Sequence, residues 1–435
     1  MAFQALRGTT DVFGEDIKRW TAVEHTARRL MRLYGYQELR TPIIEDAALF
    51  LRSVGETTDI VQKEMFRFED RGGHDIVLRP EGTAAVVRAY LEGNLHKTLG
   101  FAKLWYLGPM FRAERPQAGR LRQFHQYGVE AIGSNSPGVD VEVITLCWHI
   151  LQDCGLTKGL VWLSTMGCRN DQAQAAERLR AGLAPYRAEL CKDCQQRFDR
   201  NVFRVLDCKT PGCQELARSV LAQRPTAAGM PAVPFVPCDA CREHFDTVRR
   251  GLRDAKVPFD DTAVFARGLD YYTRTVFEVR VEGLGAKDAV AAGGRYDHLV
   301  EELGGPSLGA VGFAAGMERV LMAQQAQATS TVANGRAGVY IALAQPALFG
   351  EGFRLVQALR QHRVMALTDY DGKSLKAQLR EADKAGCQYV AILGEMELKQ
   401  RTMTVKDLAQ GTQDTVALDE FASVMAKRIP GSCHA

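Results

Sequence analysis

The chain has no strong excess of charge of either sign. Its 435 residues contain 55 lysines and arginines against 52 aspartates and glutamates, a formal net charge of +3. Whole-chain charge bears on solubility and steering, so a value this small does not indicate a nucleic-acid partner. On charge alone, a protein without such a partner is favoured, and a structured RNA would need a local basic patch.

Long apolar runs are also missing. No stretch reaches the ~20 apolar residues that a membrane-spanning helix needs, and residues 1–16 hold no apolar core of the signal-peptide type. The eleven cysteines are odd in number, which, without a secretion signal, favours reduced thiols or metal ligands over a disulfide framework. We therefore expect a cytoplasmic protein that is not embedded in a membrane.

The first clear element is a helix over residues 17–34, where apolar residues recur at helical spacing before Gly35. Residues 37–44 follow as an extended stretch that contains Pro42. Proline cannot donate to a ladder, so this strand should end, bend or lie at a sheet edge. An edge strand after a long helix suits subunit pairing, although a loop could equally cover it.

The central part of the chain alternates antiparallel strand signals with helices, which predicts an α+β domain over residues 1–324. The strand signals lie at residues 103–133, 273–281, 291–297 and 311–315. Residues 171–252 differ, because they are helix-rich and charged and hold six of the eleven cysteines. We interpret them as an insertion, since the strand signals resume afterwards.

A second domain is predicted at the end of the chain. Residues 325–336 (QAQATSTVANGR) are small, polar and aperiodic, which is typical of a linker. Beyond them, over residues 337–435, strands alternate with helices, which predicts an α/β domain of roughly 100 residues.

Polar residues recur on one face of the stretch 123–131. If it is a strand, Gln126, Gly128 and Glu130 share a face, because side chains alternate with a period of two. The glycine would leave a gap in which a small ligand could lie against the backbone. A half-exposed strand with Gln126 and Glu130 in water fits the alternation equally well.

Four arginines lie within eleven residues around this strand: Arg112, Arg115, Arg120 and Arg122. The planar guanidinium suits phosphate, and a cluster can stabilise charge that develops during nucleotidyl transfer. A solvated basic hairpin tip is the alternative. Glu114 lies inside the cluster, where it could order an arginine or help to hold Mg²⁺.

Two further motifs precede helices. Glu81 and Thr83 in LRPEGT lie on a tight turn, where they could bind a ligand or merely cap the helix. In GFAAGMER, Arg319 falls in the first turn of a helix, whose N-terminal dipole favours phosphate.

Taken together, these motifs resemble those of class II aminoacyl-tRNA synthetases. The segments that resemble motifs 1, 2 and 3 are GYQELRTPIIE at 35–45, the FRxE setting of Arg112 with the polar strand after it, and GMER at 316–319. RGLDYYTRT at 267–275 and AGGRYD at 292–297 are similar to the two signature peptides of histidyl-tRNA synthetases. RGTTDVF at 7–13 and LRPEGT at 78–83 also match that family, so the resemblance covers essentially the whole chain.

The resemblance implies an antiparallel six-stranded sheet flanked by helices, with a C-terminal anticodon-binding domain of mixed sheet and helices. It implies that histidine reacts with ATP to give histidyl-adenylate and pyrophosphate, and that the histidyl group then passes to tRNA(His). Mg²⁺ is expected with the pyrophosphate. The segment that resembles motif 1 implies a homodimer.

The resemblance also implies roles for individual residues. The residues expected to bind histidine are Glu130 and Tyr272 at the imidazole, Glu81, Thr83 and Gln126 at the α-amino group, and Tyr271 and Tyr296 around the ring. The residues expected to bind ATP are Arg112 at the α-phosphate, Arg319 at the γ-phosphate and adenine, and Glu114, Arg115 and Arg120 in the intervening loop. Arg267 is expected to be catalytic, as a fixed cation near the α-phosphate and the bound histidine.

The cysteine-rich insertion departs from this pattern. It holds two Cys-x2-Cys pairs, Cys191 with Cys194 and Cys238 with Cys241, and further potential ligands at Cys208, Cys213 and His244. Such pairs often bind structural Zn²⁺. Six thiols exceed the four that one ion needs, and the pairs are far apart, so reduced cysteines without metal are the favoured reading and structural Zn²⁺ is the alternative.

Three other functions remain to be separated from a synthetase for histidine. One is a synthetase-like regulatory subunit that has lost aminoacylation, although such paralogues typically lack the C-terminal domain and the ATP-binding arginines. The others are an RNA-binding scaffold, which would not need the polar set at Glu81, Gln126 and Glu130, and a class II enzyme for another amino acid, which would lack RGLDYYTRT.

Overall fold

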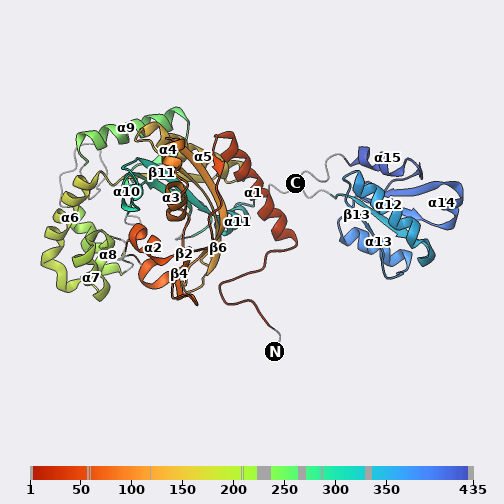
Figure 1. The fold of residues 1–435 in the computed structure, drawn as a ribbon, viewed down its shortest axis with the longest axis horizontal. Coiled ribbons are helices and arrows are strands. Elements are labelled where there is room, and N and C mark those ends of the chain that lie inside the picture. The colour runs from red at the N-terminus through yellow and green to blue at the C-terminus, as the bar shows by residue number, and fades with distance from the viewer. Residues whose placement is uncertain are drawn as a thin grey trace. The chain divides into compact units, whose positions relative to one another are not determined.

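The computed structural model describes residues 3–55, 58, 60–117, 119–206, 208, 210–222, 237–262, 271–285, 288–328 and 336–429. The chain divides into two compact units, residues 1–332 and 333–435, which are described separately (Figure 1).

The first unit is built on an eight-stranded sheet. In spatial order its strands are β1 (Gln37–Glu38), β5 (Ala102–Phe111), β6 (Gln123–Ile132), β11 (Ala310–Gly316), β10 (Ala289–Arg295), β9 (Thr273–Val281), β7 (Gly159–Thr165) and β8 (Phe259–Asp260). The six inner strands are antiparallel, which confirms the predicted fold class. The two-residue strands β1 and β8 extend the edges in parallel, and of the two only β8 was not predicted.

The extended stretch predicted over residues 37–44 is divided between two sheets. β1 forms the edge of the main sheet, as expected, but the chain leaves that sheet before Pro42. It then enters a three-stranded sheet as β2 (Ile44–Asp46), beside β4 (Asp75–Leu78) and β3 (Phe66–Glu69). The strand of the main sheet therefore ends before Pro42 and lies at the sheet edge, as the proline predicted.

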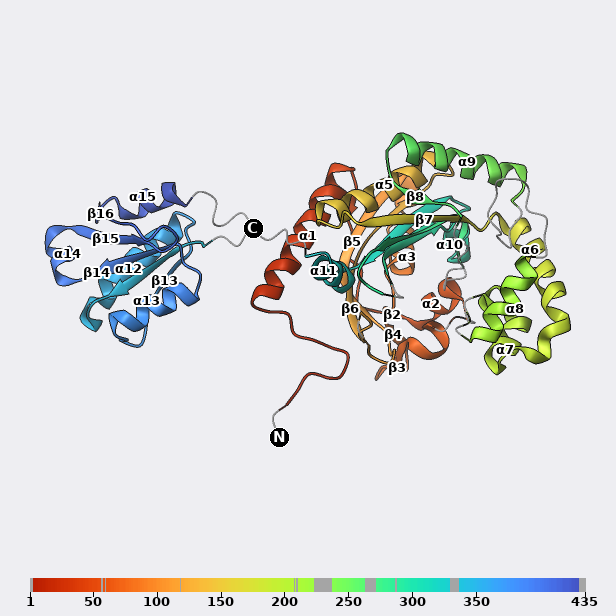
Figure 2. The same ribbon diagram turned by 180° about the vertical axis from the view of Figure 1, so that it is seen from behind.

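One face of the main sheet is covered by an apolar helical layer (Figure 2). Its helices are α1 (Glu15–Leu33), α5 (Pro137–Asp153), α9 (Asp239–Asp254) and α11 (Met317–Ala326). In α1 the buried residues Trp20, Val23 and Ala27 recur at helical spacing, and the helix ends before Gly35, whose φ is 79°. Ser136 caps α5 through its side chain, which accepts from the Gly138 amide.

The opposite face carries a smaller apolar cluster beside polar side chains. The helices here are α2 (Ala47–Val54), α3 (Thr83–Glu92), α4 (Leu95–Thr98) and α10 (Leu299–Glu302), with a π-helical turn at Ile60–Glu64. Glu130 and Gly128 belong to this face of β6, whereas Tyr127 and Val129 enter the core under α1 and α5. The period-two alternation predicted for this strand is confirmed.

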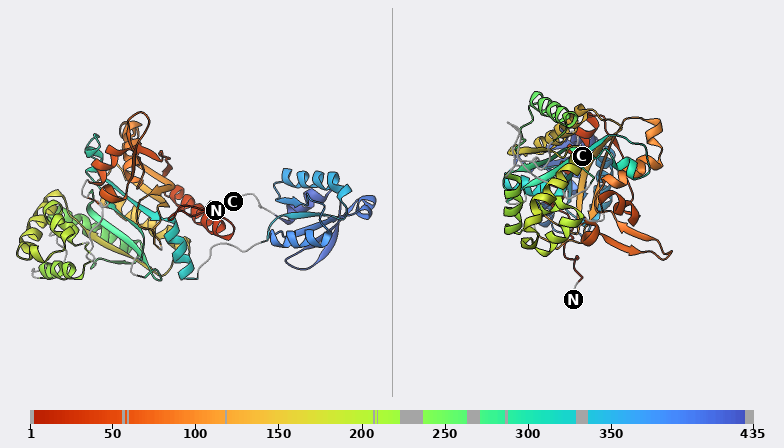
Figure 3. Two further views of the ribbon diagram at one scale, coloured as in Figure 1. Left: turned by 90° about the horizontal axis from the view of Figure 1, so that it is seen from below. Right: turned by 90° about the vertical axis from the view of Figure 1, so that its left-hand side faces the viewer.

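A helical lobe, yellow-green in Figure 3, is inserted between β7 and β8 in the sequence. It comprises α6 (Arg169–Leu183), a 3-10 turn at Ala184–Glu189, α7 (Lys192–Arg200), a 3-10 turn at Val202–Val205 and α8 (Pro211–Ala222), before α9 returns to the sheet. The lobe has a small core of its own, to which Leu183, Cys194 and Val205 contribute.

A buried ion pair connects the main sheet to α5. Arg295, at the end of β10, donates to Asp140 of α5 at 2.6 Å, and both side chains are fully buried. Arg295 also donates to the carbonyl oxygen of Ser134 at 2.5 Å, and His244 of α9 contacts Asp140 at 3.1 Å. Although burial would raise the pKa of Asp140, the hydrogen bond from His244 and the charge of Arg295 lower it.

The second unit is an α/β domain around a five-stranded sheet. The strand order is β13 (Ala366–Thr368), β12 (Val339–Leu343), β14 (Tyr389–Leu393), β15 (Thr402–Asp407) and β16 (Gln413–Ala417), with the first three parallel and the last two antiparallel to their neighbours. Its helices are α12 (Phe349–Gln361), preceded by a 3-10 turn at Pro346–Leu348, α13 (Leu375–Lys384), α14 (Glu395–Gln400) and α15 (Phe421–Arg428). Across the residues described, no helix of either unit has the length and apolarity of a membrane span.

Candidate functional site

Two adjoining cavities, of about 670 and 440 Å³, lie on the polar face of the main sheet. Residues that line both of them are Arg112, Glu114, Arg120, Gln126, Ala292 and Ala314. Glu81, Thr83, Glu130, Tyr271, Tyr272 and Tyr296 line the first cavity, and Arg319 lines the second. Residues from four distant parts of the sequence therefore meet at one place.

Glu130 is the most enclosed charged group of the first cavity, with 1% of its surface exposed. Its carboxylate accepts hydrogen bonds from the Thr83 hydroxyl at 2.8 Å and the Tyr296 hydroxyl at 2.5 Å. Burial raises its pKa to about 8 and the charge of Glu81 adds to the rise, against the two hydrogen bonds. On the neighbouring strand β11, a glycine at position 312 leaves space for the Glu130 carboxylate, because a β-carbon there would lie 1.9 Å from Oε2 of Glu130.

Glu81 lies both at the start of α3 and in the wall of the first cavity. Its two carboxylate oxygens accept from the backbone amides of Thr83 and Ala84 at 2.7 and 2.8 Å, so it caps α3. It also lines the first cavity, and burial raises its pKa. Two carboxylates whose pKa values are raised by burial make this cavity a suitable site for a cation or for a strong hydrogen-bond donor.

Gln126 contributes an unused acceptor. It lines both cavities, and its buried Oε1 has no hydrogen-bond partner among the described residues. A buried acceptor left unpaired costs free energy, and a bound donor would satisfy it.

The gap that Gly128 was predicted to leave for a ligand is instead occupied by protein. A β-carbon at Gly128 would lie 2.5 Å from the hydroxyl of Tyr106, which is directly opposite on β5. The first cavity is therefore bounded by Gln126, Glu130, Tyr271, Tyr272 and Tyr296, and not by Gly128.

Three tyrosines form an aromatic wall of the first cavity. The ring centroid of Tyr271 lies 4.8 Å from that of Tyr272 and 5.8 Å from that of Tyr296. All three side chains are buried, so the wall is apolar except at its hydroxyl groups. Arg267, predicted to be catalytic, precedes Tyr271 by four positions and lies outside the described residues.

The arginines of the β5–β6 connection are ordered by Glu114. The Glu114 carboxylate lies 2.7 Å from Nη1 of Arg120 and 4.0 Å from Nη1 of Arg112. Arg112 also donates from Nε to the carbonyl oxygen of Pro80 at 3.0 Å and places its guanidinium 5.2 Å from the Phe124 ring centroid. Two guanidinium groups are thereby held at the rim shared by both cavities.

Arg319 enters from the first turn of α11. It donates from Nε to the carbonyl oxygen of Ala289 at 2.7 Å, and burial, followed by the charge of Arg120, lowers its pKa. Cations that meet in a partly buried cavity favour an anion between them. Arg115, by contrast, is exposed and is not among the residues that line either cavity.

Arg79 and a set of residues of the insertion also help to build the site, and the sequence predicted neither. The guanidinium of Arg79 is buried and donates to the backbone carbonyls of Thr41 and Pro109, both at 2.9 Å, which fixes the turn that carries Glu81. The insertion supplies a further wall of the first cavity, through Cys191, Asp193, Arg197, Arg204, Cys208 and Thr210. No sequence pattern marked these residues as neighbours of the site.

The two Cys-x2-Cys pairs do not come together. Cys191 and Cys194 group with Cys208 and Cys213, whereas Cys238 and Cys241 group with Cys168 and Asp171. His244 joins neither group, because its Nε2 contacts Asp140. A single site built from both pairs and His244 is therefore wrong for this fold.

Comparison with known proteins identifies relatives over the whole chain. Residues 8–320 match the family model for histidyl-tRNA synthetase, and residues 338–428 match the model for an anticodon binding domain. Histidine–tRNA ligases of Desulfitobacterium hafniense and Pelotomaculum thermopropionicum are 46% and 43% identical, over 98% of this chain and 99% and 98% of theirs.

Solved structures agree. Apo histidyl-tRNA synthetase of S. aureus is 32% identical, with a TM-score of 0.79 over 98% of this chain and all of the other. An ATP phosphoribosyltransferase regulatory subunit/histidyl-tRNA synthetase from Bacillus halodurans C shares the fold at 22% identity, with a TM-score of 0.61 over 88% of this chain and 97% of that one.

Substitution of Glu130 should change how stability depends on pH. A carboxyl whose pKa rises on folding from 4.5 to about 8 holds its proton longer in the folded chain, so stability is lost as pH rises through that interval. Glu130→Gln removes this titration. The substitution should therefore raise the free energy of unfolding of the ligand-free protein more at pH 9 than at pH 5, by on the order of a few kcal/mol. Thermal unfolding midpoints at the two pH values measure the effect.

The matched control is Glu282→Gln, which changes an exposed carboxylate. Its unfolding midpoints should follow those of the unmodified chain at both pH values. A Glu130→Gln variant that also follows them would show that Glu130 does not carry a raised pKa.

Proposed function

The chain belongs to the histidyl-tRNA synthetase family, and from this premise we propose which of its side chains carry out the reaction. It activates histidine with ATP, forming histidyl-adenylate and pyrophosphate, and transfers the histidyl group to the 3′ end of tRNA(His). The observation that carries the assignment of residues is the buried Glu130 carboxylate, held by Thr83 and Tyr296 beside the unpaired oxygen of Gln126.

Histidine binds in the first cavity. Glu130 accepts the imidazole N–H, because each carboxylate oxygen retains a lone pair beyond its present hydrogen bond, and the Tyr272 hydroxyl serves the other edge of the ring. Glu81, Thr83 and Gln126 hold the α-ammonium group. Tyr271 and Tyr296 enclose the ring. A site built from buried polar groups rejects isosteres by roughly 10⁴-fold, because an analogue leaves those groups unpaired.

ATP binds across the shared rim and in the second cavity. Arg112 contacts the α-phosphate that histidine attacks, and its bond to Pro80 and its contact with Phe124 support this by fixing the guanidinium. Arg319 serves the γ-phosphate and the adenine face. Glu114 with Arg120 orders the loop over the nucleotide, and Arg115 reaches the nucleotide from the same loop.

Adenylation then needs no nucleophile from the protein. A carboxylate oxygen of histidine bonds to the α-phosphorus in line with the bridging oxygen, whose bond to that phosphorus breaks as pyrophosphate leaves. Rate comes from positioning and from stabilisation of the charge that develops on the phosphate. Arg267 supplies a further cation at this point.

Mg²⁺ accompanies ATP in this proposal. The carboxylates of Glu114, Glu278 and Asp288 line the second cavity. Mg²⁺ is usually bound by one or two carboxylates together with substrate phosphates and water, so this donor set fits the ion. When bound, it would neutralise charge on the departing pyrophosphate.

The second unit matches the anticodon binding domain, and we assign to it the anticodon of tRNA(His). Protein synthesis then places the enzyme in the cytoplasm. The chain acts as a homodimer, and large apolar side chains exposed around the segment that resembles motif 1 support this. They are Leu33 at the end of α1 and Ile43 and Ile44 beyond the edge strand β1.

Pyrophosphate exchange into ATP tests the activity. We expect exchange that depends on histidine and on none of the other amino acids when each is supplied in turn. Glu130→Gln should lower the histidine-dependent kcat/KM by roughly 10- to 100-fold, since a hydrogen bond to a charged group is lost. Glu282→Gln should leave it unchanged.

The same assay separates the rival functions. A regulatory subunit would bind histidine in a calorimeter without supporting exchange, and a synthetase for another amino acid would exchange with that amino acid instead. Either result would overturn the proposal.

Single substitutions of Arg267 and Arg112 test the two proposed catalytic cations. Replacing either with alanine should lower the rate of adenylate formation by about 10²-fold or more, because each removes a cation from the reacting phosphate. Arg71→Ala, an exposed arginine in the β3–β4 turn, serves as the control. Near-normal exchange by a folded Arg267→Ala variant would remove that residue from the mechanism.

Sedimentation at low protein concentration tests the homodimer, which should have twice the chain mass. Ile44→Asp places a charge on the exposed apolar segment and should shift the protein towards monomer. Met396→Asp makes the same kind of change at an exposed residue of the second unit and should not. A chain that sediments as a monomer without substitution refutes the dimer.

A further inference from the structure

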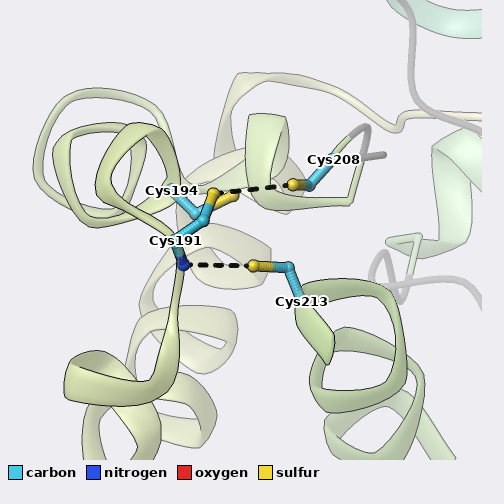
Figure 4. A group of neighbouring side chains, drawn as sticks. All are labelled: Cys191, Cys194, Cys208 and Cys213. Atoms are coloured by element: carbon cyan, nitrogen blue, oxygen red, sulfur yellow. Dashed lines mark hydrogen bonds between the residues drawn. The ribbon is translucent and has the colours of Figure 1, made fainter. Parts of the chain in front are cut away.

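Four cysteine side chains converge inside the helical lobe (Figure 4). Cys191 and Cys194 come from the start of α7, Cys208 precedes α8, and Cys213 lies in the first turn of α8. Their sulfur atoms all lie within 4.8 Å of one another. Nothing in the assigned reaction uses these thiols.

The spacing of the sulfur atoms fits a shared metal ion. Cys191 Sγ lies 3.8 Å from Cys208 Sγ, whereas sulfurs in a disulfide are about 2.05 Å apart. Four sulfurs placed tetrahedrally about 2.3 Å from Zn²⁺ would be about 3.8 Å from one another. The described cysteines are all free thiols, so no disulfide competes for these four.

The local sequence and hydrogen bonds point the same way. The set reads Cys-x2-Cys followed by Cys-x4-Cys, which is the ligand spacing of structural zinc sites. Backbone amides donate to two of the sulfurs, from Cys191 to Cys213 at 3.3 Å and from Thr210 to Cys208 at 3.4 Å. N–H donors stabilise thiolate over thiol.

We propose that Cys191, Cys194, Cys208 and Cys213 bind one structural Zn²⁺. Four protein ligands close the coordination shell and leave no position for a substrate or water, which distinguishes a structural site from a catalytic one. Three of the four side chains are buried in the lobe's own small core. A core of this size gains from a metal crosslink, because few apolar residues hold its short helices together.

The second group of thiols has a different explanation. Asp171, which lies among Cys168, Cys238 and Cys241, accepts from the amides of Cys168 and Cys238, both at 3.1 Å. The carboxylate thus ties the first helix of the lobe to the last, and this group holds three thiols against the four of the other. We therefore assign the ion to the four-cysteine group.

The ion would also fix one wall of the first cavity. Cys191 and Cys208 line that cavity together with Arg197 and Arg204 of the same lobe. A crosslink between the two cysteines sets the distance between α7 and the segment before α8. The inference does not rest on which amino acid the cavity binds.

Metal analysis of the full chain, purified without chelators and under reducing conditions, tests the site. We expect about one equivalent of zinc per chain that depends on Cys208. Cys208→Ser and Cys194→Ser should each lower the zinc content by about one equivalent, whereas Cys168→Ser, in the other group, should retain that equivalent.

A wild-type chain without zinc would overturn the proposal, as would a Cys208→Ser variant with wild-type zinc content. Zinc that is lost with Cys168→Ser but not with Cys208→Ser would place the ion in the other group.

Cobalt substitution keeps the test decisive if the serine variants do not fold. Co²⁺ added to the chelator-treated wild-type chain should give the intense absorption of a tetrahedral tetrathiolate complex, and one equivalent of Zn²⁺ should abolish it. A spectrum without tetrahedral thiolate bands would reject a four-cysteine site. Removal of zinc should also lower the unfolding midpoint of the chain.

Discussion

The burial of the Glu130 carboxylate is the constraint to which the rest of the pocket conforms. A charge removed from water must be paired, hydrogen-bonded or neutralised. The Thr83 hydroxyl, the Tyr296 hydroxyl and the space above Gly312 each meet part of that requirement. They come from three separate segments, so the position of α3, the end of β10 and the surface of β11 are linked through one side chain. The raised pKa shows that the requirement is only partly met, which leaves the carboxylate ready for a bound donor.

The Tyr296 hydroxyl reaches Glu130 because the residue before it is anchored on the far side of the sheet. Arg295 is held by Asp140 and by the Ser134 carbonyl, and the β10–β9 register shifts immediately before it. A register shift of this kind re-aims the following side chains. The buried ion pair is weak evidence of stability by itself, since desolvation offsets its attraction. Its structural consequence is positional, because it fixes where the chain turns into the pocket.

The sequence alone predicted the features that depend on the period-two alternation of a strand or on the residues of a single turn. Alternation along β6 placed Glu130 and Gln126 together, and the turn before α3 placed Glu81 and Thr83. It was insufficient where packing between strands decides. Tyr106 fills the space at Gly128 because it lies opposite on the neighbouring strand, a relation set by register. The cysteine groups of the fold differ from the pairs seen in the sequence for a similar reason. The fold brings residues at the two ends of the insertion together and separates pairs that look alike in sequence.

The two cavities differ in how their walls are held, and that difference follows from the chemistry each must perform. In our proposal the histidine side is formed by strands and a capped helix, whose backbone hydrogen bonds fix their relative positions. Such rigidity suits discrimination, because an unpaired buried group is costly only if it cannot relax. In our proposal the nucleotide side is formed by a connecting loop and by Arg319 at a helix start, and the inserted lobe adds a further wall to the first cavity. Those elements lack a ladder of their own, so their order must come from crosslinks: Glu114 between two arginines, Asp171 between two helices and, in our proposal, one ion between two pairs of thiols.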